Sequence, residues 1–263
     1  MVNQSKHISI IYPYIMKISF ITFGSHDGYI HAALRLTNQA KSFNIFSSIT
    51  AYTGKYLMAD TSFWNKHGDF IRNNKRGCGY WLWKPYLIQK SMKQLEDGDM
   101  ILYLDCGCEL DIQEKEFLEF YMETVKKDKI LGCNTFCLEE KWNKRDVIHL
   151  LDMNNSPHLK TFQHEAGALL ILVCPETREL VDQWYDVSCT YHNIDDSPSI
   201  LMETDIFKEH RHDQSIFSLL TKKHNLFSKI NMKEKCIKYI RNKTGISVLN
   251  IFNFYHKLQN KSH

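Results

Sequence analysis

The chain has 263 residues, 43% of them hydrophobic and 24% charged, with a formal net charge of +3 at pH 7. This is the composition of a globular protein with a sizeable core, and the near-balanced charge argues against a dedicated nucleic-acid-binding protein. The apolar stretch over residues 8–23 is interrupted by Pro13 and Lys17, lacks a signal-peptide cleavage site, and is too short for a membrane span. The eight scattered cysteines favour free thiols over a disulfide framework. We therefore expect a soluble, cytoplasmic protein.

The chain opens with a strand–loop–helix unit. Residues 1–15 are predicted to be an extension, and residues 16–263 a single domain. A strand is expected over residues 17–23, and an amphipathic helix with an apolar face from Tyr29 to Ala40 follows it. The unit lacks both the GxGxxG fingerprint and the P-loop Lys-Ser/Thr, so it supports neither a classical dinucleotide site nor an NTPase site.

The rest of the chain alternates strands and helices. Further strands are expected over residues 43–50, 100–104, 129–136 and 168–173. Further helices are expected over residues 83–96, 111–128, 145–153, 175–188, 215–223 and 248–258. This alternation predicts an α/β sandwich, with helices covering a Rossmann-type sheet.

The strongest chemical signal lies at the end of the strand over residues 100–104. This strand is fully apolar, and it delivers Asp105, followed two residues later by Gly107. Ligands of open α/β sheets bind at the carboxyl ends of strands, and Mg²⁺ typically takes one or two carboxylates together with substrate phosphates. Asp105 is therefore a candidate cation or ligand site, and the alternative is an aspartate that only caps a turn.

A basic loop with two glycines and Trp81 precedes the helix over residues 83–96, which begins with Trp83. Arg76 and Lys84 flank this loop, and cations near a helix N-terminus form a natural anion site. Trp81 and Trp83 are suited to stacking on a base or a sugar. The alternatives are two solvated surface cations and two core tryptophans.

Two further polar clusters precede apolar elements. They are His210-Arg211-His212-Asp213-Gln214 and Gln163-His164-Glu165. The first cluster could supply a metal ligand, a phosphate contact or a general base, whereas a simpler role for Asp213 is to cap the helix that follows. The second cluster is suited to binding an acceptor, or it is a plain loop at the edge of the sheet.

Three of these motifs together resemble GT-A-type glycosyltransferases. They are RGCGYWLWKP over residues 76–85, Asp-Cys-Gly over residues 105–107 and His-Asp-Gln-Ser over residues 212–215. The similarity is closest to a group of bacterial and large-DNA-virus proteins with RGxGYWxWKP and Asp-x-Gly motifs, and it spans residues 16–220. It implies a GT-A-like three-layer α/β/α sandwich with a mixed central sheet. It also implies transfer of a sugar, with a hexose expected, from a nucleotide-diphosphate sugar to a glycan or protein acceptor, and UDP is the expected nucleotide.

The resemblance also implies roles for individual residues. Asp213 and Glu165 would be the catalytic carboxylates, which deprotonate the acceptor in an inverting route or stabilise the sugar cation in a retaining one. The implied nucleotide- and donor-binding residues are Thr22, Phe23, Gly24, Arg76, Trp83, Lys84, Asp105, Gly107, Gln163 and Gln214.

A divalent cation, Mn²⁺ or Mg²⁺, is implied as cofactor. Asp105 corresponds to the first carboxylate of the Asp-x-Asp motif of such enzymes, but Gly107 stands in place of the second. Asp105 would then hold the ion together with a histidine, either His210 or His212, and we expect His212. Alternatively, Asp105 binds the ribose.

Two other functions remain open on the sequence alone. The missing second aspartate would suit a non-catalytic nucleotide- or carbohydrate-binding module of the same fold. A nucleotidyltransferase or metal-dependent phosphohydrolase is the other alternative, although such enzymes usually display two or more close carboxylates for paired metals.

Overall fold

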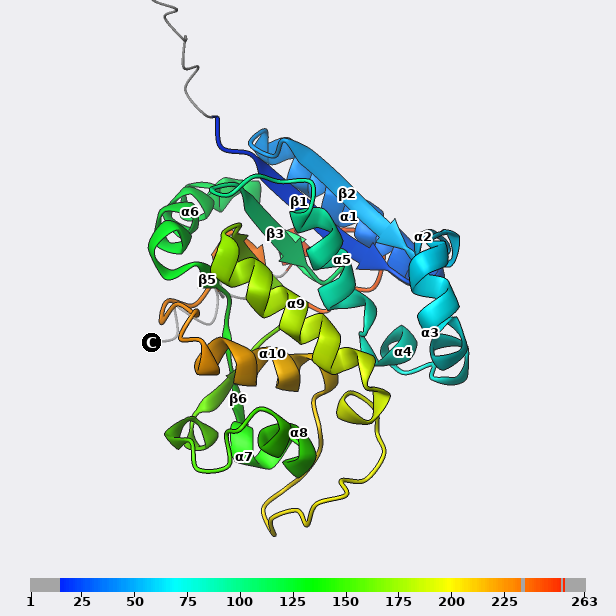
Figure 1. Ribbon diagram of the computed structural model, residues 1–263. Helices are drawn as coiled ribbons and strands as arrows, with labels where there is room; N and C mark the ends of the chain where they lie inside the picture. Colours follow the sequence, from blue (N-terminus) through cyan, green and yellow to red (C-terminus); the bar gives the residue numbers. More distant parts are fainter. Residues whose placement is uncertain (1–14, 233–234, 252, 254–263) are drawn as a thin grey trace, which may run out of the picture.

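The computed structural model describes residues 15–232, 235–251 and 253 (Figure 1). The predicted extension over residues 1–15 lies outside this part except for its last residue. The end of the predicted helix over residues 248–258 lies outside it as well.

The strands of the structure are β1 (Ile18–Gly24), β2 (Ser48–Thr53), β3 (Met100–Leu104), β4 (Glu109–Leu110), β5 (Ile130–Leu131), β6 (Asn134–Leu138), β7 (Phe162–His164), β8 (Ala168–Leu172) and β9 (Ile237–Lys238). The α-helices are α1 (Asp27–Phe43), α2 (Gly54–Ala59), α3 (Thr61–Asn73), α4 (Gly77–Tyr80), α5 (Trp83–Met92), α6 (Glu116–Asp128), α7 (Glu139–Trp142), α8 (Arg145–Leu150), α9 (Pro175–Cys189) and α10 (His212–Lys223). Three 3₁₀ turns complete the elements: η1 (Ile112–Glu114), η2 (Pro157–Lys160) and η3 (Tyr191–Asn193).

The central sheet has five strands in the order β2-β1-β3-β8-β5. β1 pairs in parallel with both β2 and β3, whereas β8 runs antiparallel to β3 and to β5. The carboxyl ends of β1 and β3 therefore meet at one edge of the sheet, and the start of β8 lies beside the end of β3. The sheet is mixed, as the resemblance implied.

Helices cover both faces of this sheet, because its buried strands present alternate side chains to opposite sides. Phe20 and Leu102 pack with α1 and α6 in one apolar cluster. Ile21 and Ile101 pack with α5, α9 and α10 in the other. Figure 1 shows α5, α9 and α10 in front of the sheet and α1 behind it. The predicted three-layer α/β/α sandwich with a mixed central sheet is confirmed.

Several predicted boundaries are wrong. The second strand is β2, not residues 43–50, because α1 continues to Phe43 and ends at Asn44, whose left-handed backbone stops the helix. The polar region that follows β2 contains α2 and α3. The strand predicted over residues 129–136 is divided into β5 and β6, which belong to two different sheets.

Two general expectations about the chain can also be compared with the structure. All eight cysteines are free thiols in the part of the chain that the structure describes. Among the described helices, none has both the length and the apolar character needed to cross a membrane.

Candidate active site

A pocket of about 450 Å³ opens where β1 and β3 end. Its walls come from the loops after these strands, the segment around α4, the start of α10, and the returning segment after β9. The residues that line it are Phe23, Ser25, His26, Tyr29, Lys75, Arg76, Gly77, Cys78, Trp81, Trp83, Lys84, Asp105, Cys106, Gly107, Cys108, Gly167, Arg211, His212, Asp213, Gln214, Tyr239, Arg241 and Lys243.

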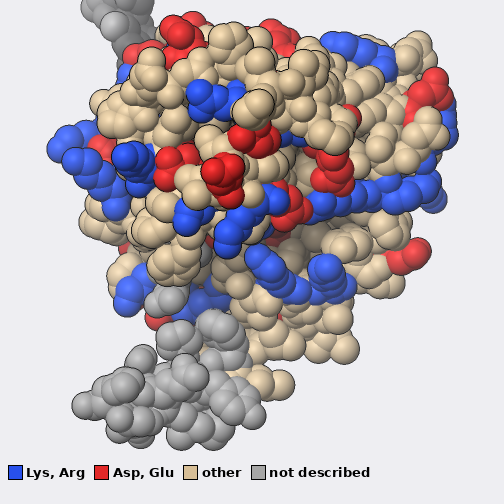
Figure 2. All heavy atoms as spheres, turned by 90° about the horizontal axis from the view of Figure 1, so that it is seen from below, with Lys and Arg blue, Asp and Glu red and all other residues tan. Residues whose placement is uncertain are grey.

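The lining of this pocket is strongly basic. It includes six lysine or arginine residues but only two carboxylates, Asp105 and Asp213. On the face that Figure 2 draws, Lys and Arg side chains form a band with Asp and Glu side chains among them. Because the net charge of the chain is only +3, the excess of positive charge in the pocket is local. Such an excess attracts anions.

The deepest polar group of the pocket is a triad formed by Lys84, Asp105 and Asp213. Lys84 Nζ lies 2.8 Å from Asp213 Oδ2 and 3.5 Å from Asp105 Oδ1. Tyr103 donates a hydrogen bond of 2.5 Å from its hydroxyl to Asp105 Oδ1. The side chains of Lys84 and Asp213 are buried, whereas Asp105 is 35% exposed. Asp105 is therefore the most exposed member of the triad, although Asp213 also lines the pocket.

Burial and neighbouring charges shift the pKa values of Lys84 and Asp213 in opposite directions. Burial lowers the pKa of Lys84, but the neighbouring Asp105 and Asp213 outweigh it, so the pKa lies above its ordinary value and the ammonium stays charged. Burial raises the pKa of Asp213 to about 6, although Lys84 opposes the shift. The triad therefore holds a fixed cation between a reachable carboxylate and a buried one.

The glycine-rich loop before α5 has an unusual backbone. All five residues from Gly77 to Trp81 have positive φ, including the non-glycine Cys78 and Tyr80. A Cβ at Gly77 would lie 2.4 Å from the Trp81 ring, so only glycine fits there. Trp83 Nε1 donates a 2.9 Å hydrogen bond to the Gly77 carbonyl, which fixes the turn against α5. This left-handed turn directs Trp81 and Arg76 to the mouth of the pocket.

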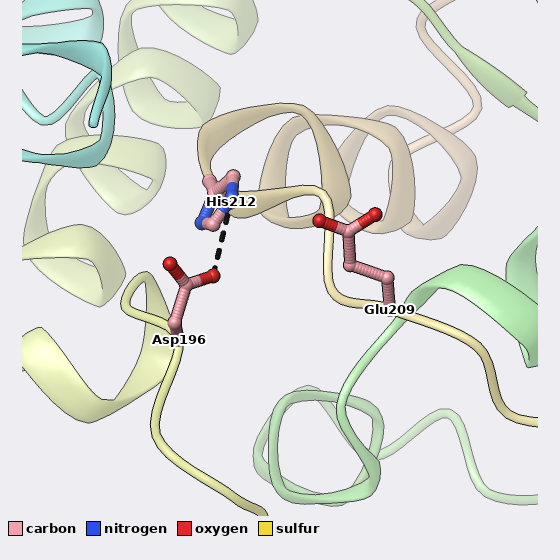
Figure 3. A group of neighbouring side chains, drawn as sticks. All are labelled: Asp196, Glu209 and His212. Atoms are coloured by element: carbon pink, nitrogen blue, oxygen red, sulfur yellow. Dashed lines mark ion pairs between the residues drawn. The ribbon is translucent and has the colours of Figure 1, made fainter.

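A second charged cluster lies at this mouth and is formed by Arg76, Asp196, Glu209 and His212. Figure 3 shows the last three of these side chains. Arg76 donates from Nη1 to Asp196 Oδ1 at 2.8 Å and from Nη2 to Glu209 Oε1 at 2.5 Å. His212 Nε2 lies 3.7 Å from Asp196 Oδ1. We call this group the rim cluster.

Arg35 of α1 connects the loop after β3 to the segment after β9. Its guanidinium donates to the carbonyls of Cys106 at 2.9 Å, Cys108 at 2.8 Å and Asn242 at 3.1 Å. It also donates to the carbonyl of Thr244. The loop after β3 and the basic segment after β9 are therefore held to each other through the Arg35 guanidinium.

Gly107 is explained by this arrangement. Asn242 donates its backbone N–H to the Gly107 carbonyl at 2.8 Å. A Cβ at residue 107 would lie 3.1 Å from Arg241 Cα, which is tighter than an ordinary contact. An aspartate side chain at this position would press against the returning segment. That segment instead brings Tyr239, Arg241 and Lys243 into the pocket.

The structure brings together many of the residues expected in the site. Phe23, Trp83 and Gln214 line the pocket, as do residues of the triad and of the rim cluster. The rings of Phe23 and Trp83 stack with their centroids 3.9 Å apart. Gln214 donates a 3.0 Å hydrogen bond to Gln163 Oε1, so Gln163 lies behind the lining and supports Gln214. The roles assigned to these residues remain predictions.

Besides Gln163, three of the expected catalytic and donor-binding residues lie outside the lining: Thr22, Gly24 and Glu165. Thr22 is buried in β1, and the space beside Gly24 is filled by the backbone of Tyr29. Glu165 precedes β8 and is partly buried. Asp213, for which an alternative role was helix capping, lies within the first turn of α10, and Arg211 is at the N-cap position.

Two parts of the site were not predicted from the sequence. They are the rim carboxylates, Asp196 and Glu209, and the basic residues Arg241 and Lys243, which we call the basic wall. Asp196 and Glu209 lie in a segment without helix or strand, and no spacing pattern links them to Arg76. Arg241 and Lys243 left one signal, the basic composition toward the C-terminal end of the chain.

The structure places His212, but not Asp105, in a group of three potential metal ligands. Among the described residues, the one group of three potential ligands is Asp196, Glu209 and His212, whose ligand atoms lie within 4.8 Å of one another. Asp105 stands as a lone carboxylate, with its Oδ1 bonded to Tyr103 and facing the Lys84 ammonium. A divalent cation prefers several oxygen ligands and no adjacent fixed cation. The surroundings of Asp105 therefore do not fit one.

Comparison with known proteins gives a likeness in structure only. No protein-family model matches the chain, and no curated protein matches it in sequence. Glycosyltransferases are among the solved structures that it resembles. Xyloside xylosyltransferase 1 from mouse, in its apo form, is 10% identical, with 82% of this chain and 85% of that chain covered and a TM-score of 0.42. The galactosyltransferase LgtC, in complex with donor and acceptor sugar analogues, is 15% identical, with 76% and 70% covered and a TM-score of 0.41.

A third similar structure is a glycosyltransferase involved in glycosylation of the major capsid of PBCV-1. It is 7% identical, with 65% of this chain and 66% of that chain covered and a TM-score of 0.37. Likeness at these levels does not establish a shared activity, which has to be judged from the site itself.

Proposed function

We propose that the protein is a glycosyltransferase that moves a sugar from a nucleotide-diphosphate sugar to a hydroxyl group of a glycan or protein. One observation carries this proposal: a basic pocket at the carboxyl ends of β1 and β3 contains a reachable carboxylate, Asp105, and a buried one, Asp213, on either side of Lys84. Ligands of open α/β sheets bind at this place in the fold. We further propose UDP as the nucleotide and a hexose as the sugar.

The cations of the pocket suit the diphosphate of such a donor. Arg211, Arg241 and Lys243 line the pocket together with Lys84. When the bond between sugar and diphosphate breaks, negative charge develops on the leaving phosphate, and preorganised cations stabilise that charge most strongly. We therefore assign the basic wall to stabilising the leaving diphosphate. Lys84, which is held in place by Asp105 and Asp213, would contribute a further positive charge.

Aromatic side chains in the lining suit the rest of the donor. The rings of Tyr29 and Trp81 line the pocket, and the stacked Phe23 and Trp83 close its inner side. Flat rings of this kind contact the faces of bases and sugars at low cost in side-chain entropy. We assign the partly exposed Asp105 to hydrogen bonds with ribose or sugar hydroxyls.

The reacting carbon would lie near Asp213 and Gln214 at the start of α10. In an inverting reaction a carboxylate takes the proton of the acceptor hydroxyl, and in a retaining reaction it stabilises the sugar cation. Asp213 is assigned to this role, with Glu165 as the second candidate. Gln163 supports Gln214 through their 3.0 Å hydrogen bond and thereby holds its amide toward the pocket.

The experiment that tests this proposal is a donor panel. Thermal unfolding would be followed with UDP-, GDP- and CMP-sugars, and donors that bind would then be assayed for transfer and hydrolysis. A ligand at a hundred times its dissociation constant adds about 2.7 kcal/mol to the free energy of unfolding, so binding of one nucleotide class is readily visible. Transfer that is lost in Asp105→Ala supports the proposal.

Two outcomes would overturn it. Binding of a donor without any transfer or hydrolysis would favour the non-catalytic binding module. Release of pyrophosphate from a plain nucleoside triphosphate would favour a nucleotidyltransferase instead.

A further inference from the structure

The rim cluster joins the two ends of one exposed segment. Asp196 lies at the start of this segment and Glu209 at its end, and between them the chain forms neither helix nor strand. His212 follows as the first residue of α10. The two carboxylates thus come from the two ends of this segment, and the imidazole comes from the start of the helix that follows it (Figure 3).

The His212 ring is fixed in orientation and tautomer. Its Nδ1 lies 2.8 Å from the Ile194 carbonyl, which can only accept, so Nδ1 carries the proton in the neutral ring. The ring stacks on Tyr80 with centroids 5.0 Å apart and lies 5.3 Å from the ring of Trp81. The Nε2 lone pair is therefore held in one direction.

That direction is toward the carboxylates. The side chain of His212 is only 3% exposed, and its Nε2 is buried without a hydrogen-bond partner among the described residues. It faces Asp196 Oδ1 across 3.7 Å, as Figure 3 shows. The lone pairs of the buried Nε2 and of the partly exposed carboxylate repel each other unless a cation lies between them. An imidazole nitrogen in this state has the orientation of a metal ligand whose other nitrogen is fixed by a carbonyl.

We propose that Asp196, Glu209 and His212 form a binding site for a divalent cation of the Mn²⁺ class, separate from Asp105. Their ligand atoms lie within 4.8 Å of one another, so small side-chain movements bring all three to one ion. Two carboxylates and one imidazole leave coordination positions for water or an incoming oxygen. Carboxylate and imidazole ligands suit Mn²⁺, whereas thiolate ligands select softer metals.

Arg76 is the competitor of the ion at this site. Its guanidinium now bridges the same two carboxylates, at 2.8 Å and 2.5 Å. A bound divalent cation would neutralise Asp196 and Glu209 and repel the guanidinium. Since Arg76 also lines the pocket, the released side chain could then contact an anion there. This last consequence rests on the proposed function, whereas the cation site itself does not.

The test is titration of the purified protein with Mn²⁺ alone, with free Mn²⁺ measured by its electron paramagnetic resonance signal. We expect one Mn²⁺ per chain. Asp196→Asn and Glu209→Gln should each weaken binding at least tenfold, because even changes beyond the direct ligands of a metal cost ten- to a hundredfold in affinity. Both side chains are about two-fifths exposed, so these variants should fold. Arg76→Met should tighten binding, because it removes the competing cation.

Two matched controls separate this site from others. Asp205→Asn removes an exposed carboxylate from the same segment and should leave Mn²⁺ affinity unchanged. Asp105→Asn should also leave it unchanged, whereas it would weaken binding if Asp105 were a ligand.

The proposal is overturned if Asp196→Asn and Glu209→Gln bind Mn²⁺ as the unmodified chain does, or if no Mn²⁺ binds at millimolar concentration. It is also overturned if Arg76→Met weakens binding. A separate titration with UDP in the absence of metal then reports on the proposed function by itself. The cation site and the donor site can therefore fail independently.

Discussion

Two charge clusters at one pocket are built on the same plan but in different surroundings. In each, one cation lies between two carboxylates: Lys84 between Asp105 and Asp213, and Arg76 between Asp196 and Glu209. The side chain of Lys84 is 4% exposed and that of Arg76 is 46% exposed. The triad comes from a strand end and two helices, whereas Arg76, Asp196 and Glu209 of the rim cluster come from irregular segments.

The difference in burial decides what each cluster can do. Removing one partner of a buried ion pair leaves an uncompensated charge and costs about 3–5 kcal/mol, whereas an exposed pair contributes about 0–1 kcal/mol. The triad therefore fixes the position of its charges, and exchange of Lys84 for another cation would carry a large free-energy cost. The rim cluster can exchange its cation, which is what a binding site at a pocket mouth requires.

The largest expected effect follows from Lys84→Met. Without the ammonium, Asp213 is buried beside Asp105 with no compensating charge, so we expect the free energy of unfolding to fall by about 3–5 kcal/mol. Donor binding and transfer should both be lost. Urea unfolding and a transfer assay measure the two effects.

The matched control for this variant is Lys222→Met. Lys222 is equally buried and pairs with the buried Glu139 at 2.6 Å, away from the pocket. Its loss should lower stability in a similar way but leave donor binding intact at a temperature where the variant is folded. Equal loss of binding in both variants would mean that Lys84 acts only through stability.

A smaller effect on the fold, but a large one on activity, is expected from Asp213→Asn. The amide has the same shape and keeps an oxygen toward Lys84, while it cannot accept a proton or balance a sugar cation. We expect transfer to fall by at least about a hundredfold, as for loss of a general base, with donor binding retained. A steady-state assay with donor and acceptor varied separately measures this.

Asp182→Asn serves as its control, because Asp182 is an exposed carboxylate on α9 that accepts from Gln89. It should transfer sugar at the unmodified rate. If Asp213→Asn also kept that rate, the catalytic role would pass to Glu165.

For the rim cluster we expect Arg76→Ala to change stability by less than about 1 kcal/mol, since its ion pairs are exposed. Affinity for UDP in the presence of Mn²⁺, which releases Arg76 from its two carboxylates, should nevertheless fall about tenfold, because a hydrogen bond to a charged phosphate contributes about 1.5–3 kcal/mol. Calorimetric titration with UDP gives the affinity. Arg72→Ala, which removes an exposed arginine paired with Asp69 on α3, should change neither quantity.

The smallest effect concerns salt. The Debye length falls to about 3 Å at 1 M salt, and exposed charges are screened more than buried ones. Any stability difference between Arg76→Ala and the unmodified protein should therefore vanish at about 1 M NaCl. The deficit of Lys84→Met should persist, as measured by urea unfolding at both salt concentrations. Equal salt dependence in both variants would contradict the contrast between the two clusters.

Sequence analysis was most successful where local patterns decide the structure. β3 begins and ends where predicted, since five apolar residues follow the turn residues Asp97-Gly98-Asp99. That strand places Asp105 at the sheet edge without help from distant contacts. The position of Lys84 could be predicted in the same way, because its helix begins at Trp83 as expected.

The parts of the site that could not be predicted depend on contacts between distant residues. The start of α10 was expected at residue 215, but His212 takes a left-handed φ of 53° and begins the helix three residues earlier. The rings of Tyr80 and Trp81, together with the Ile194 carbonyl, hold it there. Asp196 and Glu209 meet Arg76 across 120 and 133 positions of sequence, and no local pattern encodes that meeting.

The Arg35 anchor determines when the pocket can exist during synthesis of the chain. It joins Cys106 and Cys108 to Asn242 and Thr244, which a ribosome adds more than a hundred residues later. Chains grow at about 5–20 residues per second, and early parts can fold first. The triad can therefore assemble only after α10 emerges, and the basic wall later still. A nascent chain passes through a stage in which its sheet is complete but its anion site is open on one side.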